Sequence, residues 1–317
     1  MGLFLCSDAS NEMLAALHPE WNEKAGLLLI EKFGLPADER IAVEDVFPWS
    51  NELSEGVDAI VFSKSFFVQP DLFLRIRPGF HDKVLDSLKS REVSFSFIPP
   101  ATLRLPNTFK VADFFANGEE VVVQDLNSQN TGRFLPTHFS NVWDCCAASG
   151  GKSIMAFDKH ASINLTVSDI RESIIQNLRK RFATAGIRHY QAMVIDLARS
   201  QSGLPGRHEF DLIICDVPCS GSGTWSRTPE QLFYFDGKRN IDHYARLQQK
   251  ILSNVYPALK PGGHLLYITC SVFRRENEEA ISFLKEKYKM TLIRQEILKG
   301  YDQKADTLFA ALLVKSL

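Results

Sequence analysis

The chain has 317 residues, of which 45% are hydrophobic and 23% charged, and its formal net charge is −2. This is an ordinary globular composition for one large domain or two of moderate size, and the near-neutral charge gives no general argument for a nucleic-acid partner. No run of 18 apolar residues predicts a membrane span, and the first residues lack the cationic and apolar regions of a signal peptide.

The first part of the chain is predicted to be helical and then mixed. Residues 18–36 carry the pattern of one helix that ends at Gly34 and Pro36. Two strand patterns, at 71–79 and 93–99, flank a helical pattern with one apolar face. This strand–helix–strand unit fits a small α+β domain, and it fits a packing extension of the rest of the chain equally well.

From about residue 120 onward, strand and helix patterns alternate. Such alternation is typical of a parallel sheet covered by helices on both faces, in which ligands bind at the carboxyl ends of the strands. The predicted strands are 120–125, 141–147, 165–169, 191–196, 210–218, 264–270, 290–296 and 307–315, and the predicted helices are 152–161, 171–185, 241–259 and 276–288.

A loop of small residues follows the second of these strands. Ala147, Ala148, Gly150 and Gly151 let a ligand approach the backbone closely, and the helix that follows offers free N–H groups. The spacing matches neither the Walker A pattern nor GxGxxG, so a dinucleotide is disfavoured.

Acidic residues end three further strands. Asp169 lies where Rossmann-like sheets place an acid that accepts hydrogen bonds from ribose hydroxyls. Asp196 is placed to contact an adenine amine, and Asp216 ends the next strand. Each acid alone is unremarkable, but the series in order indicates an adenosine-type ligand. Because the dinucleotide fingerprint is missing, S-adenosylmethionine fits better than NAD.

The six cysteines lack the CxxC spacing of zinc and redox sites, so we expect no metal, and free thiols in the cytoplasm. Cys145 and Cys215 lie inside apolar runs, where packing is the usual role of a cysteine, and Cys146 lines the glycine loop. Cys219 and Cys270 each follow a strand end, on two strands that we expect to be neighbours. Both thiols would then face the crevice that holds the methyl donor.

A thiol in such a crevice has a specific use in methyl transfer. Carbon 5 of cytosine is not nucleophilic enough until a thiolate adds to carbon 6. The site must favour a thiolate, for which Lys152 is a candidate, and Asp216 is placed to contact the N3/N4 edge of the base and, if protonated, to polarise it. A base inside a duplex cannot reach such a pocket, so the target must be single-stranded or flipped out.

Five longer segments carry a resemblance to a known family. They occur in the order VVVQDLNSQ, DCCAASGGKS, DVPCSGSGTWSRTPE, YITCSVFRRENEE and ADTLFAALLVK. Together they resemble the motifs of the Sun/Nol/Fmu family of RNA cytosine-5 methyltransferases. The resemblance implies a Rossmann-like class I methyltransferase domain with a mostly parallel seven-stranded sheet at 113–317. It also implies a smaller helical and α+β RNA-binding extension at 1–112.

The resemblance further implies roles for the matching residues. Cys270, in the TCS motif, corresponds to the family's nucleophile, and Cys219, in the PCS motif, is associated with release of the methylated product. The chemistry above adds Asp216 and Lys152 to this catalytic group. The S-adenosylmethionine site corresponds to Cys146, Ala147, Ala148, Ser149, Gly150, Gly151, Lys152, Asp169, Asp196 and Asp216.

Two positions depart from the family pattern. Ser149 replaces the proline of the glycine loop, which leaves the backbone donors in place. Ser226 replaces the first arginine of an RRxP segment and leaves Arg227, so it bears on a local RNA-backbone contact more than on catalysis. DNA cytosine-5 enzymes resemble this site but use a cysteine that follows proline, which would favour Cys219. The TCS and ENE signature favours Cys270.

We therefore expect an RNA (cytosine-5) methyltransferase that uses S-adenosylmethionine and acts on ribosomal RNA, with tRNA as the second choice and no membrane partner. One rival is a DNA cytosine methyltransferase, which would form its adduct through Cys219. Another is a non-catalytic RNA-binding ribosome assembly factor, which would bind the cofactor without turnover on any RNA.

Overall fold

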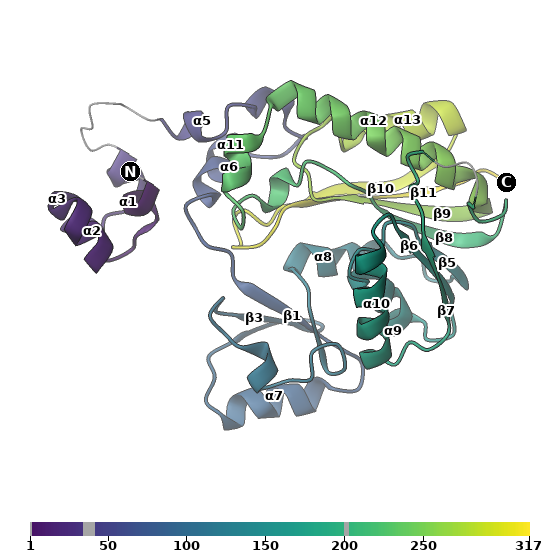
Figure 1. Cartoon of the computed structure of the whole chain (residues 1–317), viewed down its shortest axis with the longest axis horizontal. Coiled ribbons are helices and arrows are strands. Elements are labelled where there is room, and N and C mark those ends of the chain that lie inside the picture. Colours follow the sequence, from purple (N-terminus) through teal and green to yellow (C-terminus); the bar gives the residue numbers. More distant parts are fainter. Residues whose placement is uncertain (1, 34–41, 200–202) are drawn as a thin grey trace.

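The structure, a computed structural model, describes residues 2–33, 42–199 and 203–317. Two sheets organise the described residues, one of four strands and one of seven. In Figure 1 the smaller sheet lies beside the helices that cover one face of the larger sheet. Arg75 and Arg77 of the smaller sheet both form ion pairs with Asp158 on one of these helices, and so join the two parts.

The larger sheet has the order β10-β11-β9-β8-β5-β6-β7, with parallel pairing from β9 to β7 and antiparallel pairing of β10, β11 and β9. The predicted mostly parallel seven-stranded sheet is thereby confirmed. Its strands are β5 Asn141–Asp144, β6 Asn164–Asp169, β7 Tyr190–Val194, β8 Phe210–Asp216, β9 Leu259–Thr269, β10 Thr291–Leu298 and β11 Leu308–Val314.

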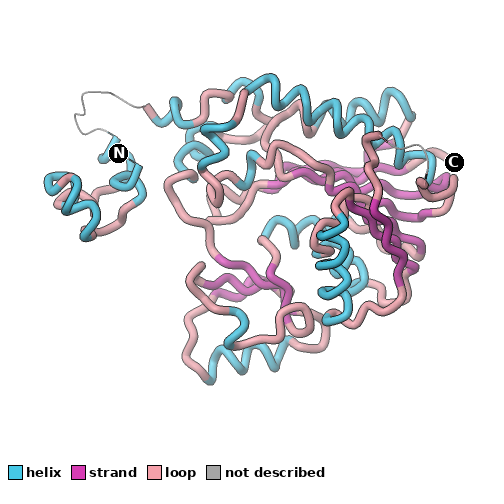
Figure 2. Tube along the Cα trace, viewed as in Figure 1, coloured by secondary structure: helices cyan, strands magenta, loops and turns pink. Residues whose placement is uncertain are grey.

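Helices cover both faces of this sheet, and Figure 2 shows the strands enclosed between them. Side chains alternate along β8, so that Leu212 and Ile214 join one apolar core and Ile213 and Cys215 join the other. Because both faces are buried there, β8 and β11 are almost entirely apolar, whereas the edge strand β10 is largely exposed and carries polar side chains. The four long helices are α9 Gly151–Lys159, α10 Glu172–Thr184, α12 Gly237–Val255 and α13 Glu278–Tyr288.

The order of the strands sets the place of the crevice. The chain runs from β5 outward to β6 and β7, then returns to β8 on the other side of β5. At such a switch point the loops after the two central strands diverge to opposite faces and leave room for a ligand. The loops that follow β5 and β8 contain the glycine loop and Cys219, as the sequence predicted.

The smaller sheet has the order β2-β3-β1-β4 and is antiparallel throughout. Helix α7 covers one face with the buried side chains of Val84 and Leu88. The sequence analysis did not predict β3. The elements are β1 Leu72–Ile76, α7 His81–Ser90, β2 Ser96–Ile98, β3 Thr102–Leu105 and β4 Val121–Val123.

Strand β4 corrects one sequence-based expectation. The pattern at 120–125 was predicted to belong to the parallel sheet, but β4 pairs with β1, with Leu74 opposite Val123 and Ile76 opposite Val121. Local pattern does not specify which sheet a short valine run joins. The break between the two sheets therefore falls after residue 123, beyond the division predicted at 112/113.

The N-terminal residues form short helices instead of one long one. The single helix predicted over 18–36 is wrong, because α3 ends at Asn22 and α4 begins at Leu29, with turns between them. Gly26, a poor helix former, lies in these turns. The predicted end at Gly34 and Pro36 lies outside the described residues. The N-terminal helices are α1 Gly2–Cys6, α2 Glu12–Leu17, α3 Pro19–Asn22, α4 Leu29–Phe33, α5 Val43–Val46 and α6 Ala59–Ser65.

An aromatic cluster joins the segment from α5 to α6 to the loops at the crevice. Phe47 stacks on Phe273, with ring centroids 5.7 Å apart, and also contacts Trp225. Trp225 follows Cys219 and Phe273 follows Cys270 in the chain, so this cluster supports both cysteine loops. The remaining short elements are α8 Leu126–Asn130, α11 Glu230–Tyr234 and the 3-10 turns Ser50–Glu52, Val111–Asp113, Thr131–Phe134, Ser222–Thr224 and Tyr256–Ala258.

Candidate active site

The glycine loop between β5 and α9 makes a tight turn against α10. Ala148 and Gly150 have φ angles of +45° and +81°, a backbone region that glycine adopts easily. A Cβ atom at Gly150 would lie 2.6 Å from the Phe182 ring, so only glycine fits there. The carbonyl of Ser149 accepts a hydrogen bond from Arg181 at 2.9 Å, and this backbone contact does not depend on the family's proline.

A cavity of about 500 Å³ runs along the carboxyl ends of β5 to β8. The carboxylate of Asp169 is fixed at its wall, because it accepts hydrogen bonds from the backbone N–H groups of Ala148 at 3.2 Å and Arg171 at 3.0 Å. Apolar side chains form much of the remaining wall. The predicted site residues that line this first cavity are Cys146, Ala148, Asp169, Asp196, Asp216, Cys219 and Cys270.

A second cavity of about 280 Å³ adjoins the first, and the two share Ala148, Asp216 and Cys270. Most of the residues that line it carry polar side chains. Four of the residues predicted for the cofactor, Ala147, Ser149, Gly151 and Lys152, line this second cavity and not the first, and Gly150 lines neither. Its other polar wall residues are Gln124, Asp125, Ser128, Asp144, Arg181, Thr224 and Asp306.

The thiols of Cys219 and Cys270 lie together at the junction of the two cavities. Their sulfur atoms are 3.2 Å apart, because β8 and β9 are neighbours with Asp216 opposite Ile268. The hydrogen bond with Cys270 and burial raise the pKa of the Cys219 thiol well above its usual range. Cys219 is therefore a neutral thiol at neutral pH. The structure brings together the two cysteines that the sequence placed at neighbouring strand ends.

Lys152 and Asp216 form an ion pair beside these thiols. Their Nζ and Oδ2 atoms are 2.6 Å apart, and Nζ also donates to the hydroxyl of Ser128 at 3.3 Å. Burial by itself would lower the pKa of Lys152, but the carboxylate of Asp216 outweighs it and raises that pKa. Lys152 therefore carries a positive charge at the wall of the second cavity.

Asp144, the last residue of β5, is a site residue that the sequence analysis missed. Its Oδ2 accepts a hydrogen bond from the Ser153 hydroxyl at 2.6 Å, and its Oδ1 has no hydrogen-bond partner among the described residues. Burial, opposed in part by the Ser153 bond, raises its pKa to about 7. The signal was present, because Asp144 ends its strand as Asp169 and Asp216 end theirs.

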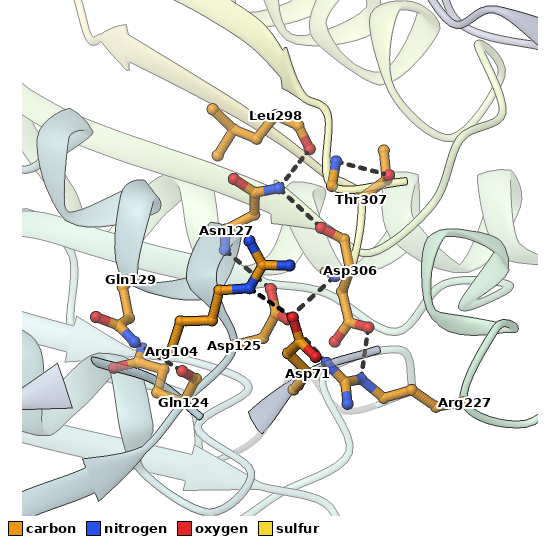
Figure 3. A network of polar contacts seen from close by, with 11 residues as sticks. Asp71, Arg104, Gln124, Asp125, Asn127, Gln129, Arg227, Leu298, Asp306 and Thr307 are labelled. Carbon is orange, nitrogen blue, oxygen red and sulfur yellow. Dashed lines mark hydrogen bonds and ion pairs between the residues drawn. The ribbon is translucent and has the colours of Figure 1, made fainter. Parts of the chain in front are cut away.

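A polar network built from three distant segments closes the far side of the second cavity. Figure 3 shows Arg227 next to Asp306, and their Nε and Oδ1 atoms are 2.7 Å apart. Arg227 also pairs with Asp125 at 3.0 Å, and Asp125 accepts the backbone N–H of Asp306. Burial and the charge of Asp125 raise the pKa of Asp306 to about 6.

This network changes the expectation for Arg227. The sequence analysis considered it as what remained of an RNA-backbone contact after the Ser226 replacement. In the structure its guanidinium is held by two carboxylates of the protein. The amide of Asn127 extends the network by donating to the carbonyls of Leu298 and Asp306 (Figure 3). Arg227 thus joins the Cys219 loop to both the α8 segment and the start of β11.

Neither a metal-binding cluster nor a membrane-spanning helix is found in the part of the chain that the structure describes. The described residues contain no cluster of three or more His, Cys, Asp or Glu side chains placed to hold a metal ion. Within the same ranges, every helix is too short or too polar to cross a membrane.

Comparison with known proteins gives a consistent result. A family model described as 16S rRNA methyltransferase RsmB/F matches residues 133–311. The chain is 31% identical over 236 residues to the ribosomal RNA small subunit methyltransferase B of Enterobacter sp. (strain 638). The aligned region covers 71% of this chain and 53% of that protein. It is also 31% identical over 224 residues to the protein of the same name from Salmonella newport (strain SL254), covering 67% and 50%. The chain spans about half the length of these curated relatives.

A solved structure shares the fold over most of this chain. A methyltransferase homologue from Pyrococcus horikoshii superposes with a TM-score of 0.71 at 20% identity, covering 90% of this chain and 97% of that one. At this identity the likeness concerns the fold, and it includes both the Rossmann-like domain and most of what precedes it.

Proposed function

Because the chain belongs to the 16S rRNA methyltransferase RsmB/F family, we propose that it methylates carbon 5 of a cytosine in ribosomal RNA. The methyl donor in this proposal is S-adenosylmethionine, and the reaction proceeds through a covalent adduct with Cys270. One observation carries the proposal: Cys270 lies where two cavities meet, with the Cys219 thiol 3.2 Å away. A donor and an acceptor can therefore be held on two sides of one sulfur atom.

The first cavity suits the adenosine part of the donor. Asp169 is held ready to accept from ribose hydroxyls, and Asp196 stands at the next strand end for the adenine amine. Ile170, Ile195 and Leu197 supply apolar walls for a purine ring. When bound, S-adenosylmethionine supplies an electrophilic methyl group. Every other part of the reaction falls to the residues of this chain.

The second cavity suits the target base. Its polar wall provides Asp216, whose carboxylate can accept a hydrogen bond from the exocyclic amine of cytosine, as acids do in base recognition. Lys152 places a positive charge at the same wall, which is the environment that a thiolate nucleophile requires. Since the cavity is enclosed by loops from three segments, the cytosine must enter unstacked from its neighbours.

The proposed steps balance in atoms and charge. The Cys270 thiolate bonds to carbon 6, the displaced electron pair moves to carbon 5, and carbon 5 bonds to the methyl group as the bond between that methyl and the donor's sulfur breaks. A base then removes the proton from carbon 5, and the sulfur–carbon 6 bond breaks to restore the ring and release the Cys270 thiolate. The neutral thiol of Cys219, 3.2 Å from the departing sulfur, can donate a hydrogen bond to that thiolate. That is a physical reason for a role of Cys219 in product release.

Covalent trapping tests the proposal. Wild type, Cys219→Ala and Cys270→Ala are incubated with S-adenosylmethionine and 16S rRNA and examined on denaturing gels. We expect Cys219→Ala to accumulate a protein–RNA adduct and Cys270→Ala to form none and to lose methylation. Cys215→Ala serves as the matched control, since this thiol lies inside β8, and should behave as wild type. An adduct through Cys219, or full activity of Cys270→Ala, contradicts the assignment.

The same assay separates the rival substrates and functions. Repeating it with tRNA and with DNA distinguishes ribosomal RNA from the second choices. Cofactor binding without turnover on any RNA would instead favour a non-catalytic RNA-binding assembly factor. In the proposal, residues 1–112 together with β4 hold the RNA by shape and phosphate contacts, and the rest of 113–317 forms the methyltransferase domain, acting in the cytoplasm.

A further inference from the structure

Glu276 is a fully buried carboxylate six residues after Cys270 that the proposed reaction does not use. Its Oε2 accepts a hydrogen bond from the backbone N–H of Ser220 at 2.8 Å, and its Oε1 accepts one from the hydroxyl of Ser271 at 2.9 Å. The amide of Gln248 donates to Oε2 at 3.3 Å. Three donors from three segments therefore converge on one side chain.

These donors belong to the two cysteine loops. Ser220 follows Cys219 directly, and Ser271 follows Cys270 directly. The two serine hydroxyls are also 3.2 Å apart, so the chains meet at this point. The carboxylate thus fixes the position of the residue that follows each of the two cysteines.

Gln248 also holds the residue that precedes Cys219. Its amide, which donates to Glu276, also donates to the carbonyl of Pro218 at 3.1 Å. The residues before and after Cys219 are therefore both held from this one group. A buried carboxylate with several donors is rigid, since each lost contact would leave a buried polar group unsatisfied.

Glu278, two residues after Glu276, has a different set of partners. Glu278 accepts hydrogen bonds from the hydroxyl of Ser54 at 2.9 Å and the backbone N–H of Glu55 at 3.3 Å. Neither partner adjoins a cysteine. Burial raises the pKa of both Glu276 and Glu278, although Glu276 is fully buried and Glu278 only partly, and the two acids differ in the residues that they hold.

We infer that Glu276 is a positioning residue that sets the separation of the Cys219 and Cys270 thiols. Its consequence for catalysis rests on the proposed function, but its effect on the two thiols does not. A glutamine at this position has one acceptor oxygen and an NH₂ group, so it cannot accept from both Ser220 and Ser271 in the same geometry.

The charge of Glu276 contributes to the state of Cys219. The neighbouring Cys270 thiol and burial have the larger effects on the pKa of Cys219, and the Glu276 carboxylate raises it further. Tyr244 and Tyr267 also interact with this thiol, and both stay neutral because burial raises their pKa values. Removing the negative charge at 276 therefore lowers the pKa of Cys219.

The test compares Glu276→Gln with Glu278→Gln, the same substitution two residues apart. Rates of alkylation of Cys219 and Cys270 are measured between pH 6 and pH 10 by peptide mass spectrometry, with melting temperatures as the check on folding. In Glu276→Gln we expect the Cys219 profile to move to lower pH by about one unit. In Glu278→Gln it should stay as in wild type. Identical profiles in both variants would overturn the inference.

A methylation assay tests the catalytic consequence separately. Misplacement of reacting groups by about 1 Å lowers rates by about 100-fold, so we expect a loss of this size in turnover by Glu276→Gln. The KM for S-adenosylmethionine should change little. If wild type fails to methylate cytosine, the proposed function fails, while the alkylation profiles still decide the role of Glu276.

A second variant covers the case in which Glu276→Gln does not fold. Ser271→Ala removes one donor to the carboxylate and leaves the bond from Ser220 in place. We expect an altered alkylation rate at Cys270 and a loss of turnover of at least about tenfold, because the Ser271 hydroxyl bonds Glu276 and also accepts from the backbone N–H of Phe273. Wild-type rates at both thiols and wild-type turnover would count against the inference.

Discussion

The protein contains two pairs of thiols with nearly the same geometry and different surroundings. Cys145 and Cys215, the buried pair, have sulfur atoms 3.3 Å apart between β5 and β8. Cys219 and Cys270, the crevice pair, have sulfur atoms 3.2 Å apart between the loops after β8 and β9. The buried pair is at most 1% exposed, whereas both members of the crevice pair are partly exposed.

The difference shows that closeness of two thiols does not make a reactive site. Burial raises the pKa values of both Cys145 and Cys215, and no cation lies beside them among the groups that shift those pKa values. The crevice pair lies one strand over and a few residues further along, where the strands end and Lys152 and two cavities adjoin it. The second cavity and the neighbouring cation, and not the strand end alone, therefore distinguish the crevice pair, since Cys145 also directly follows a strand end.

The largest expected contrast between the pairs is in alkylation of the folded protein. We expect iodoacetamide to label Cys270 at least about 1,000-fold faster than Cys215, because a fully buried thiol reacts only after an opening that costs several kcal/mol. Peptide mass spectrometry at low reagent concentration measures each rate. All the thiols should react alike in urea, and rapid labelling of Cys215 in the folded state would remove the distinction.

The next effect concerns Asp144, which precedes Cys145 in the chain and shares the second cavity with Cys270. Its pKa is raised from 3.8 to about 7, so between these values the folded protein binds a proton that the unfolded chain releases. Its contribution to stability is therefore present at low pH and falls as pH rises towards 7, by roughly 1.4 kcal/mol per pH unit.

Urea unfolding of wild type and Asp144→Asn at pH 5, 6 and 7 measures this contribution. The asparagine carries no charge at any of these values, so its free energy of unfolding should fall less steeply with pH than that of wild type. Other acids, including Asp306, titrate in both proteins and cancel in the difference. Parallel curves would mean that Asp144 is ionised in the folded protein throughout.

The smallest effect is expected from the buried pair itself. Cys215→Ala should lower the free energy of unfolding by about 1–2 kcal/mol, as is usual for a shortened buried side chain. Methylation per folded molecule should stay within about twofold of wild type, since Cys215 lines neither cavity. Chemical denaturation and a methylation assay on the same preparation check both statements. A selective loss of activity would show that the buried pair reaches the chemistry after all.

The alternation of strands and helices that builds the larger sheet could be predicted from the sequence, because this alternation is visible in local patterns. Apolar runs ending in Asp169 or Asp216, each followed by a helix, indicate a parallel sheet without knowledge of the partners. Strand β3 was missed because it is four residues long between Pro100 and Pro106, which read as a loop. Strand β4 was assigned to the wrong sheet because its partner, β1, lies some 45 residues earlier.

The candidate site also contains residues that local patterns predict and residues that they do not. The strand-end rule found Asp169, Asp196, Asp216 and both crevice cysteines, and the family that the motifs resemble was confirmed by the comparisons. The strand-end rule did not predict the roles of residues whose partners lie far away in the chain. Arg227 contacts acids from two other segments, and Glu276 contacts a serine 56 residues away. Such pairings follow from the folded arrangement and are not visible in spacing.

The pairing of β4 with β1 also bears on how this protein can be divided for laboratory work. A fragment starting at residue 113 would retain β4 but lose its only neighbour in the smaller sheet, β1. The side chain of Val121, now fully buried in the core of the smaller sheet, would then face solvent on an unprotected edge that invites self-association. A shortened version meant for crystallisation or ligand screening should therefore keep the entire smaller sheet, beginning ahead of Leu72.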